Sequence, residues 1–98
     1  MHRSIILPLA KEDIREAERW YNKQSPGLGK KFTAEVRESV RFIRQNPTAC
    51  NIRYDKVRTV VLKVFPFMIH YTINEASKSV VISAVLHTSR DPKEWENR

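Results

Sequence analysis

The hydrophobic pattern of this chain changes its period about halfway along. Up to Asn46 and Pro47 the apolar residues recur every three or four positions, as on one face of an α-helix. From Thr59 onward β-branched and aromatic residues alternate between two faces, as in β-strands. A chain of 98 residues has room for one domain, and helices followed by strands predict an α+β fold for it.

The first half predicts a short strand and a helical hairpin. The apolar run 4–7 ends at Pro8, as in a strand that leads into a helix. The apolar face of this helix comprises Ala10, Ile14, Ala17 and Tyr21, with Trp20 widening it. Ser25 and Pro26 are expected to cap and open a second helix, whose apolar face comprises Leu28, Phe32, Val36, Val40 and Ile43. Because so few residues join the helices, they should pack antiparallel.

The second half predicts three antiparallel strands. Two candidate strands cover 59–64 and 67–73 and are separated by a Phe-Pro turn. After a polar turn, the third covers 79–87, while 48–58 is the predicted irregular loop. The expected topology is therefore β-α-α-β-β-β, with an antiparallel sheet, the helical hairpin on one of its faces and a short C-terminal helix.

Alternation assigns the side chains of these strands to two faces. The helix-facing set comprises Val60, Leu62, Val64, Phe67, Ile69, Tyr71, Ile73, Val80, Ile82, Ala84 and Leu86. The opposite, open face comprises Val61, Lys63, Met68, His70, Thr72, Ser83, Val85 and His87. His70 and His87 would share this open face and could act there as acid and base. Neither has an acidic neighbour in its strand, so partly exposed histidines without a catalytic role are the alternative.

The C-terminal segment predicts a capped helix. Asp91 can accept a hydrogen bond from the backbone N–H of Glu94, and Glu94 can reach back as in a capping box. Pro92 suits the first helical turn. Trp95 would then pin this helix to the sheet, while Arg90 lies just outside the cap with its guanidinium free. An ion pair of Arg90 with a nearby acid such as Glu94 is the alternative. Asp91, Pro92 and Trp95 are therefore interpreted as structural, as is Trp20 in the first helix.

Basic residues outnumber acidic ones. The chain has 18 Lys and Arg against 11 Asp and Glu, a net charge of +7, which favours a polyanion or an acidic protein as partner. Two cationic rows lie at helical spacing: Arg15, Arg19 and Lys23 on the first helix, and Arg37, Arg41 and Arg44 on the second. The alternative to a partner-binding role is that ion pairs within the helices partly neutralise these rows, since Glu12, Glu16 and Glu38 stand three positions before an arginine.

Other sequence features indicate the compartment of the protein and whether it needs a metal or cofactor. The single Cys50 excludes an internal disulfide and fits a reducing compartment. The apolar start is too short for a signal peptide, and no run approaches a membrane span, which predicts a soluble, cytoplasmic protein. The histidine spacing matches no metal motif, and both glycines belong to the helical turn instead of a phosphate loop. No metal or other cofactor is expected.

Five short motifs follow one another along the chain: Trp20-Tyr21, Pro26-Gly27-Leu28-Gly29, Asn46-Pro47, Phe65-Pro66 and Arg90-Asp91-Pro92. Their order and spacing resemble the RelE/ParE superfamily of bacterial toxins, and its ParE branch in particular. The resemblance implies the toxin of a type II toxin–antitoxin module, silenced by a ParD-like antitoxin whose extended segment wraps it. A ParE-like toxin is expected to poison DNA gyrase without enzymatic activity of its own. Arg90 is the first candidate contact, and the two cationic rows are further partner-binding candidates.

The RelE branch is the alternative, because its members cleave messenger RNA on the ribosome with cations around the phosphate. Where such enzymes carry an arginine in the middle strand, this chain reads Phe67-Met68-Ile69-His70-Tyr71, and Trp95 stands at the position of their terminal tyrosine. A nuclease would have to be assembled from Lys63, His70, His87 and Arg90. A third possibility is a toxin fold that now only binds a partner.

Overall fold

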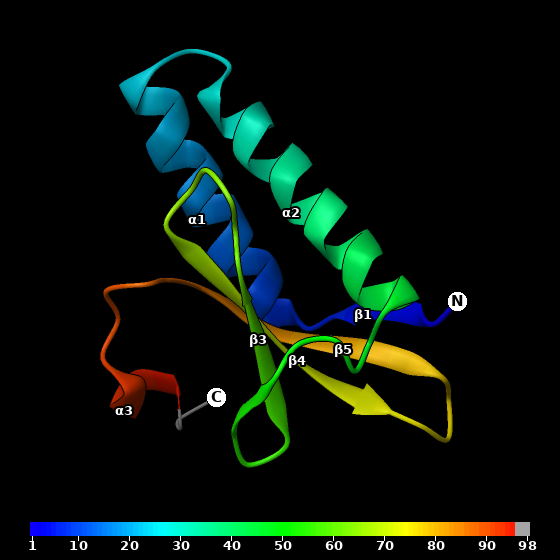
Figure 1. The fold of residues 1–98 in the computed structure, drawn as a ribbon. Coiled ribbons are helices and arrows are strands. Elements are labelled where there is room, and N and C mark those ends of the chain that lie inside the picture. Colours follow the sequence, from blue (N-terminus) through cyan, green and yellow to red (C-terminus); the bar gives the residue numbers. More distant parts are fainter. Residues whose placement is uncertain (96–98) are drawn as a thin grey trace.

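The computed structural model describes residues 1–95 of the chain (Figure 1). Its elements are β1 (Arg3–Ile6), α1 (Pro8–Gln24), α2 (Leu28–Gln45), β2 (Ile52–Tyr54), β3 (Val57–Val61), β4 (Phe67–Asn74), β5 (Ser79–His87) and α3 (Pro92–Trp95). The strands form one sheet in the order β1-β5-β4-β3-β2. The predicted α+β fold, with a helical hairpin and a short C-terminal helix, is confirmed.

The sheet is mixed. β3, β4 and β5 pair antiparallel as predicted, whereas β1 lies parallel to β5, with Arg3 opposite Ser79 and Ile6 opposite Ile82. The chain between these two strands, which contains α1, α2, β2, β3 and β4, supplies the long connection that parallel strands require. β1 and β2 are the two edge strands of the sheet.

The segment 48–58 contains a strand, so the prediction of an irregular loop is wrong there. β2 and β3 form a tight hairpin in which Ile52 pairs with Arg58. Asp55 makes the turn with a φ of +49°, and aspartate adopts this left-handed conformation more readily than most residues. β3 consequently begins at Val57 and ends at Val61, ahead of the predicted strand at both ends.

The chain leaves β3 early because one carboxylate of α2 holds the connection to β4. Glu35 accepts hydrogen bonds from the backbone N–H groups of Lys63 at 2.6 Å, Val64 at 3.1 Å and Phe65 at 3.3 Å. These donors are thus satisfied without a neighbouring strand. Val64, predicted to face the core, is instead 79% exposed.

The turn between the helices differs in detail from the prediction. α2 begins at Leu28, preceded by Gly27 with a φ of +86°, so Pro26 lies in the turn and does not open the helix. Gly29 marks a close approach of the helices, since a Cβ atom there would lie 2.6 Å from the Glu18 carbonyl oxygen. Both glycines of the chain are therefore explained by backbone geometry.

A β-bulge in β5 decides which side chains reach which face of the sheet. The pairing register between β4 and β5 shifts at Ser83, where β5 has one residue more than β4. An extra residue reverses the alternation of side chains beyond it. Val85 therefore packs in the helix-side core, whereas Ala84 and Leu86 pack on the opposite face. The predicted faces of these three residues, and of His87, are wrong.

Both faces of the sheet carry a core. The helix-side core comprises Ala10, Ala17, Tyr21, Phe32, Val36, Val40, Ile43, Leu62, Phe65, Ile69, Tyr71, Val80, Ile82 and Val85. A smaller core on the opposite face comprises Met68, Ala84, Leu86 and Trp95, with Tyr54 packed against it. The face that the sequence predicts to be open is therefore covered, where these residues lie, by α3 and β2.

Candidate functional site

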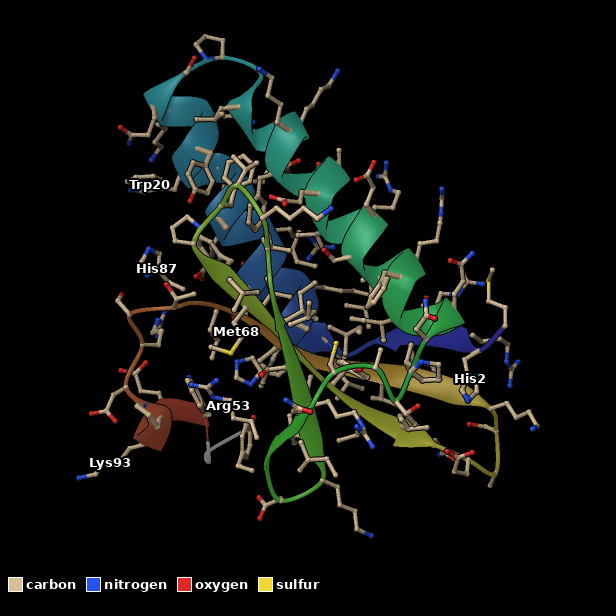
Figure 2. The ribbon with its side chains drawn as sticks, in the orientation of Figure 1. His2, Trp20, Arg53, Met68, His87 and Lys93 are labelled. Carbon is tan, nitrogen blue, oxygen red and sulfur yellow. The ribbon has the colours of Figure 1, made fainter. Side chains whose placement is uncertain are left out.

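A hollow between α1 and the end of β5 brings together Trp20, His87 and Arg90. It has a volume of about 220 Å³ and is lined by Asp13, Glu16, Ala17, Trp20, Phe67, Val85, Leu86, His87 and Arg90. Trp20 and His87 lie on the same side of the molecule (Figure 2). We call this site the α1–β5 hollow.

Trp20 forms an exposed rim of the α1–β5 hollow. Its side chain is 57% exposed and contacts the Tyr21 ring edge-on, with 5.1 Å between the ring centroids. The interpretation of Trp20 as part of the buried stripe is wrong, because the core-facing side of α1 is formed by Ala10, Ala17 and Tyr21. A tryptophan that keeps this much apolar surface in solvent is a typical centre of a protein contact.

His87 faces α1 across the hollow. Its ring meets the Phe67 ring at a centroid distance of 5.3 Å. The backbone N–H of Ser89 donates to Nδ1 at 3.1 Å, and the Ser89 Oγ lies 2.7 Å from the same nitrogen. Because Nδ1 accepts a hydrogen bond, neutral His87 carries its proton on Nε2 and offers it as a donor.

Arg90 forms an ion pair with Glu94, which is the alternative that the sequence left open, so the prediction of a free guanidinium is wrong. Its Nη1 donates to Glu94 Oε2 at 2.9 Å, and both side chains are about half exposed. This hydrogen bond raises the pKa of Arg90, and the carboxylates of Glu94, Asp13 and Glu16 also raise it. Such an exposed pair is worth roughly 0–1 kcal/mol, so a partner carboxylate can compete for the arginine.

The terminal helix begins as predicted but with a different cap. Asp91 Oδ1 accepts from the N–H of Lys93 at 2.9 Å, while the N–H of Glu94 donates to the Asp91 backbone carbonyl, also at 2.9 Å. Glu94 pairs with Arg90, so the predicted capping box is absent from this part of the described chain. Pro92 opens the helix as expected.

Trp95 pins α3 to the sheet, as the sequence predicts. Its ring is 7% exposed and packs with the second core, 5.7 Å from the Tyr54 ring and 5.1 Å from the His70 ring. Arg53 places its guanidinium carbon 5.3 Å from the Trp95 ring centroid, a cation–π contact.

His70 lies beneath this cover and not on an open face. It is 0% exposed, and its Nδ1 lies 3.0 Å from the Tyr54 hydroxyl. Because the bulge at Ser83 reverses the alternation of side chains in β5, His87 packs on the helix side of the sheet. His70 lies on the opposite side. The two histidines therefore cannot act together as acid and base, and His70 is also not the partly exposed histidine of the alternative.

The cationic rows are only partly neutralised. Glu12 approaches both Arg15, at 3.6 Å, and Arg19, at 3.4 Å. The other two pairs of the alternative, Glu16 with Arg19 and Glu38 with Arg41, do not occur among the described residues. Lys23 is exposed at the end of α1. Arg37, Arg41 and Arg44 line a groove beside β1.

The four residues of the nuclease alternative lie in separate surroundings. Lys63 lines a hollow of about 360 Å³ between α2 and β3, together with Glu35, Glu38, Ser39, Phe42, Val60 and Val61. His70 is buried under Trp95, whereas His87 and Arg90 belong to the α1–β5 hollow. This set therefore forms no common cationic cleft.

Within residues 1–95, no group of three or more His, Cys, Asp or Glu side chains is placed to hold a metal ion. No helix in the same range is long and apolar enough to cross a membrane.

Comparison with known families decides the relationship of the chain. Residues 5–92 match the family of the ParE toxin of the type II toxin–antitoxin system parDE. The chain belongs to the ParE toxin family. The resemblance seen in the sequence motifs is thereby confirmed, and the protein is a toxin of the type II toxin–antitoxin class. No curated protein sequence matches the chain significantly.

Solved structures share the fold of this ParE-family chain at low identity. A chain of the chromosomal ParDE system of P. aeruginosa is 21% identical, with a TM-score of 0.77 over 89% of this chain and 96% of that one. A chain of the intact E. coli RelBE toxin–antitoxin complex is 13% identical, with a TM-score of 0.71 over 92% and 100%. The isolated E. coli RelE toxin is also 13% identical, with a TM-score of 0.70 over 99% and 95%.

Several residues that shape these sites could not be identified as site residues from the sequence patterns. Asp13 of α1 accepts a hydrogen bond from the backbone of β5 and lines the α1–β5 hollow. Tyr54 and Arg53 cover the second core from a segment predicted to be loop. The alternation of Ile52 and Tyr54 was the available signal for β2, whereas nothing in the sequence marks Asp13 among the other acids of α1.

Proposed function

We propose that this ParE-family toxin inhibits DNA gyrase and that a ParD-like antitoxin silences it. The observation that carries the proposal is the match to the ParE family over residues 5–92. Structural neighbours from a ParDE system and a RelBE toxin–antitoxin complex support a cognate antitoxin as partner.

The α1–β5 hollow supports a role in protein binding. It combines an exposed tryptophan rim, a histidine donor and an arginine, and tryptophan and arginine are enriched among the residues that dominate protein interfaces. Arg90 would exchange Glu94 for a carboxylate of the partner at little cost in free energy, since it forms a solvent-exposed ion pair both before and after the exchange. We assign Trp20, His87 and Arg90 to the gyrase contact.

A ribosome-dependent mRNA endoribonuclease is the second candidate. The fold similarity to the isolated RelE toxin and the net charge of +7 favour it. RNA cleavage would need cations gathered around one phosphate and a group that activates the 2′-OH. The dispersal of Lys63, His70, His87 and Arg90 argues against the site that the sequence suggests for it.

Two assays on the purified chain separate these functions. In a supercoiling assay with purified gyrase, the chain should inhibit supercoiling and increase the amount of cleaved DNA. In a purified translation system, messenger RNA should stay intact at the same toxin concentration. Messenger RNA cleavage with unaffected gyrase would replace the first proposal by the second.

Trp20→Ala tests the assigned surface. The variant should keep the melting temperature of the parent chain, because the side chain is mostly in solvent, and should lose gyrase inhibition at least about tenfold. Phe42→Ala is the matched control, since Phe42 is a 46% exposed aromatic on α2 that lines a different hollow. Equal losses of gyrase inhibition in the two variants would show that the α1–β5 hollow is not the gyrase-binding surface.

A further inference from the structure

The connection between β3 and β4, residues 62–66, is fixed from two sides although it lies at the surface. We call it the β3–β4 loop. Glu35 of α2 accepts hydrogen bonds from three consecutive backbone N–H groups of this loop, at 2.6 to 3.3 Å. From the β5 side, the N–H of Thr88 donates to the Pro66 carbonyl at 2.9 Å. Successive N–H groups that point at one anion bind it together, so a carboxylate from a distant helix fixes the backbone of the loop.

Two neighbouring side chains of the β3–β4 loop lie in opposite surroundings. Phe65 is buried and packs edge-on against the rings of Tyr21 and Phe32, with centroid distances of 4.8 and 5.4 Å. Val64 is 79% exposed and forms the tip of the loop. A single exposed valine is common on a protein surface. Here, however, the backbone beneath it is already fixed, so a partner that binds the tip pays little conformational entropy for ordering the loop.

The β3–β4 loop borders the α1–β5 hollow. It lies next to α1 (Figure 1), where Phe65 of the loop and Trp20 of the hollow contact the same ring, that of Tyr21, at 4.8 and 5.1 Å. At its other end the loop continues into Phe67, which lines the hollow and contacts the His87 ring at 5.3 Å. The loop and the rim of the hollow are therefore neighbours on the molecule, and one partner can contact both.

We propose that the β3–β4 loop is a target-binding loop, in which Val64 inserts into an apolar pocket of the target protein and Glu35 holds the loop in the binding conformation. The inference rests on the proposed function in that the target protein is gyrase. Exposed loops carried on a rigid scaffold are a common location for binding residues. Because Glu35 acts through the backbone of the loop, its role is that of a positioning residue, whereas Val64 makes the contact.

A protein pocket fits this loop better than a nucleic acid. Three N–H groups in a row would suit a phosphate, but Glu35 occupies them, and its negative charge repels a second anion. The aromatic ring of the loop, Phe65, is buried and offers no surface on which a base could stack. The exposed tip is aliphatic, and an aliphatic side chain gains binding free energy when an apolar pocket removes it from water.

Substitutions of Val64 test the tip of the loop on the full chain. Val64→Asp should keep the melting temperature of the parent chain, because the side chain is in solvent, and should weaken gyrase inhibition at least about tenfold. Val64→Ser should act in the same direction without adding a charge, and Val64→Leu should inhibit as well as the parent chain. Ile52→Asp is the matched control, since Ile52 is a 54% exposed β-branched residue whose strand, β2, adjoins the opposite end of β3. Equal losses in Val64→Asp and Ile52→Asp would overturn the proposal.

The positioning role of Glu35 is tested by hydrogen exchange and by a double variant. Glu35→Ala should speed exchange of the amides of residues 63–65 and weaken gyrase inhibition, and Glu35→Gln, which keeps one acceptor oxygen, should lie between it and the parent chain. In a chain that already carries Val64→Ala, Glu35→Ala should weaken inhibition much less, because Glu35 acts through the tip. An equal loss with and without Val64→Ala would overturn the positioning role.

Growth arrest in bacteria that lack the antitoxin separates this inference from the proposed function, because it reports toxicity whatever the target is. If the parent chain arrests growth without inhibiting gyrase, the gyrase proposal fails, and a loss of arrest in Val64→Asp but not in Ile52→Asp still supports the binding loop. If the parent chain and Val64→Asp inhibit gyrase and arrest growth equally, the binding loop is refuted and the gyrase proposal stands.

Discussion

Asp13 of α1 accepts a hydrogen bond at 3.0 Å from the backbone N–H of Val85 in β5. The donor lies beyond the last β5 residue that β1 covers, since the parallel pairing ends with Ile6 opposite Ile82. A carboxylate thus replaces a missing strand partner and ties α1 to the sheet next to the α1–β5 hollow.

Asp13→Ala should destabilise the protein by about 2 kcal/mol, because it leaves a partly buried N–H without this acceptor. Asp13→Asn keeps a carbonyl oxygen at the same distance and should cost less than half as much. Denaturant unfolding of both variants measures the difference. Equal costs would show that the charge of Asp13, and not this hydrogen bond, provides the stabilisation.

Trp95→Ala should cost about 3 kcal/mol, through the cavity left under α3 and the loss of its packing on the second core. Trp95→Phe should cost less, since it keeps an aromatic ring and removes an indole N–H that has no hydrogen-bond partner among the described residues. Thermal unfolding checks the order. A Trp95→Ala protein that keeps its melting temperature but loses gyrase inhibition would assign Trp95 to the target contact.

Tyr71→Phe should lower stability by about 1–2 kcal/mol at neutral pH, because the Tyr71 hydroxyl donates to the Pro47 carbonyl at 2.8 Å in a fully buried position. Burial raises the pKa of Tyr71, and the neighbouring Cys50 thiol raises it further. The folded state therefore holds this proton more tightly than the unfolded state.

This shift has a defined sign in the pH dependence of stability. Below pH about 10 the phenol is neutral in both states and its full contribution is present. As the pH rises above about 10, the unfolded state ionises first and stability falls. The parent chain should lose more stability than Tyr71→Phe between pH 9 and about 11, measured by urea unfolding. Parallel losses in the two proteins would contradict the raised pKa.

Arg90→Ala should leave folding almost unchanged, since its ion pair with Glu94 is exposed and worth roughly 0–1 kcal/mol. Gyrase inhibition should fall about tenfold or more, if the guanidinium binds a carboxylate of the target. Lys56→Ala, an equal loss of charge in the exposed turn between β2 and β3, is the control. Full inhibition by Arg90→Ala would exclude Arg90 from the contact.

His87→Ala distinguishes the proposed functions further. His70 is buried, so its replacement would disturb folding, whereas His87 lies at the hollow and can be replaced alone. A protein contact predicts a moderate loss of gyrase inhibition without any change in messenger RNA. If the parent chain cleaves messenger RNA in the translation system and His87→Ala does not, His87 serves in the nuclease alternative.

Local patterns in the sequence predicted the elements that local physics controls. The helical stripes, the stop at Asn46, the terminal helix at Pro92 and the strand 79–87 all follow from spacing, capping and proline chemistry within a few residues of each position. The family motifs depend on the same local features, which is why the relationship to ParE toxins was visible before the fold.

Long-range pairing decided what the sequence did not. The bulge at Ser83 depends on the register between β4 and β5, and a single extra residue sends Val85 to one face and Leu86 to the other. β2 and α3 then cover His70, while the same reversal brings His87 to Trp20 and Arg90. The sequence determined which side chains were available, but their faces and neighbours depended on strand register, which is set by partners distant along the chain.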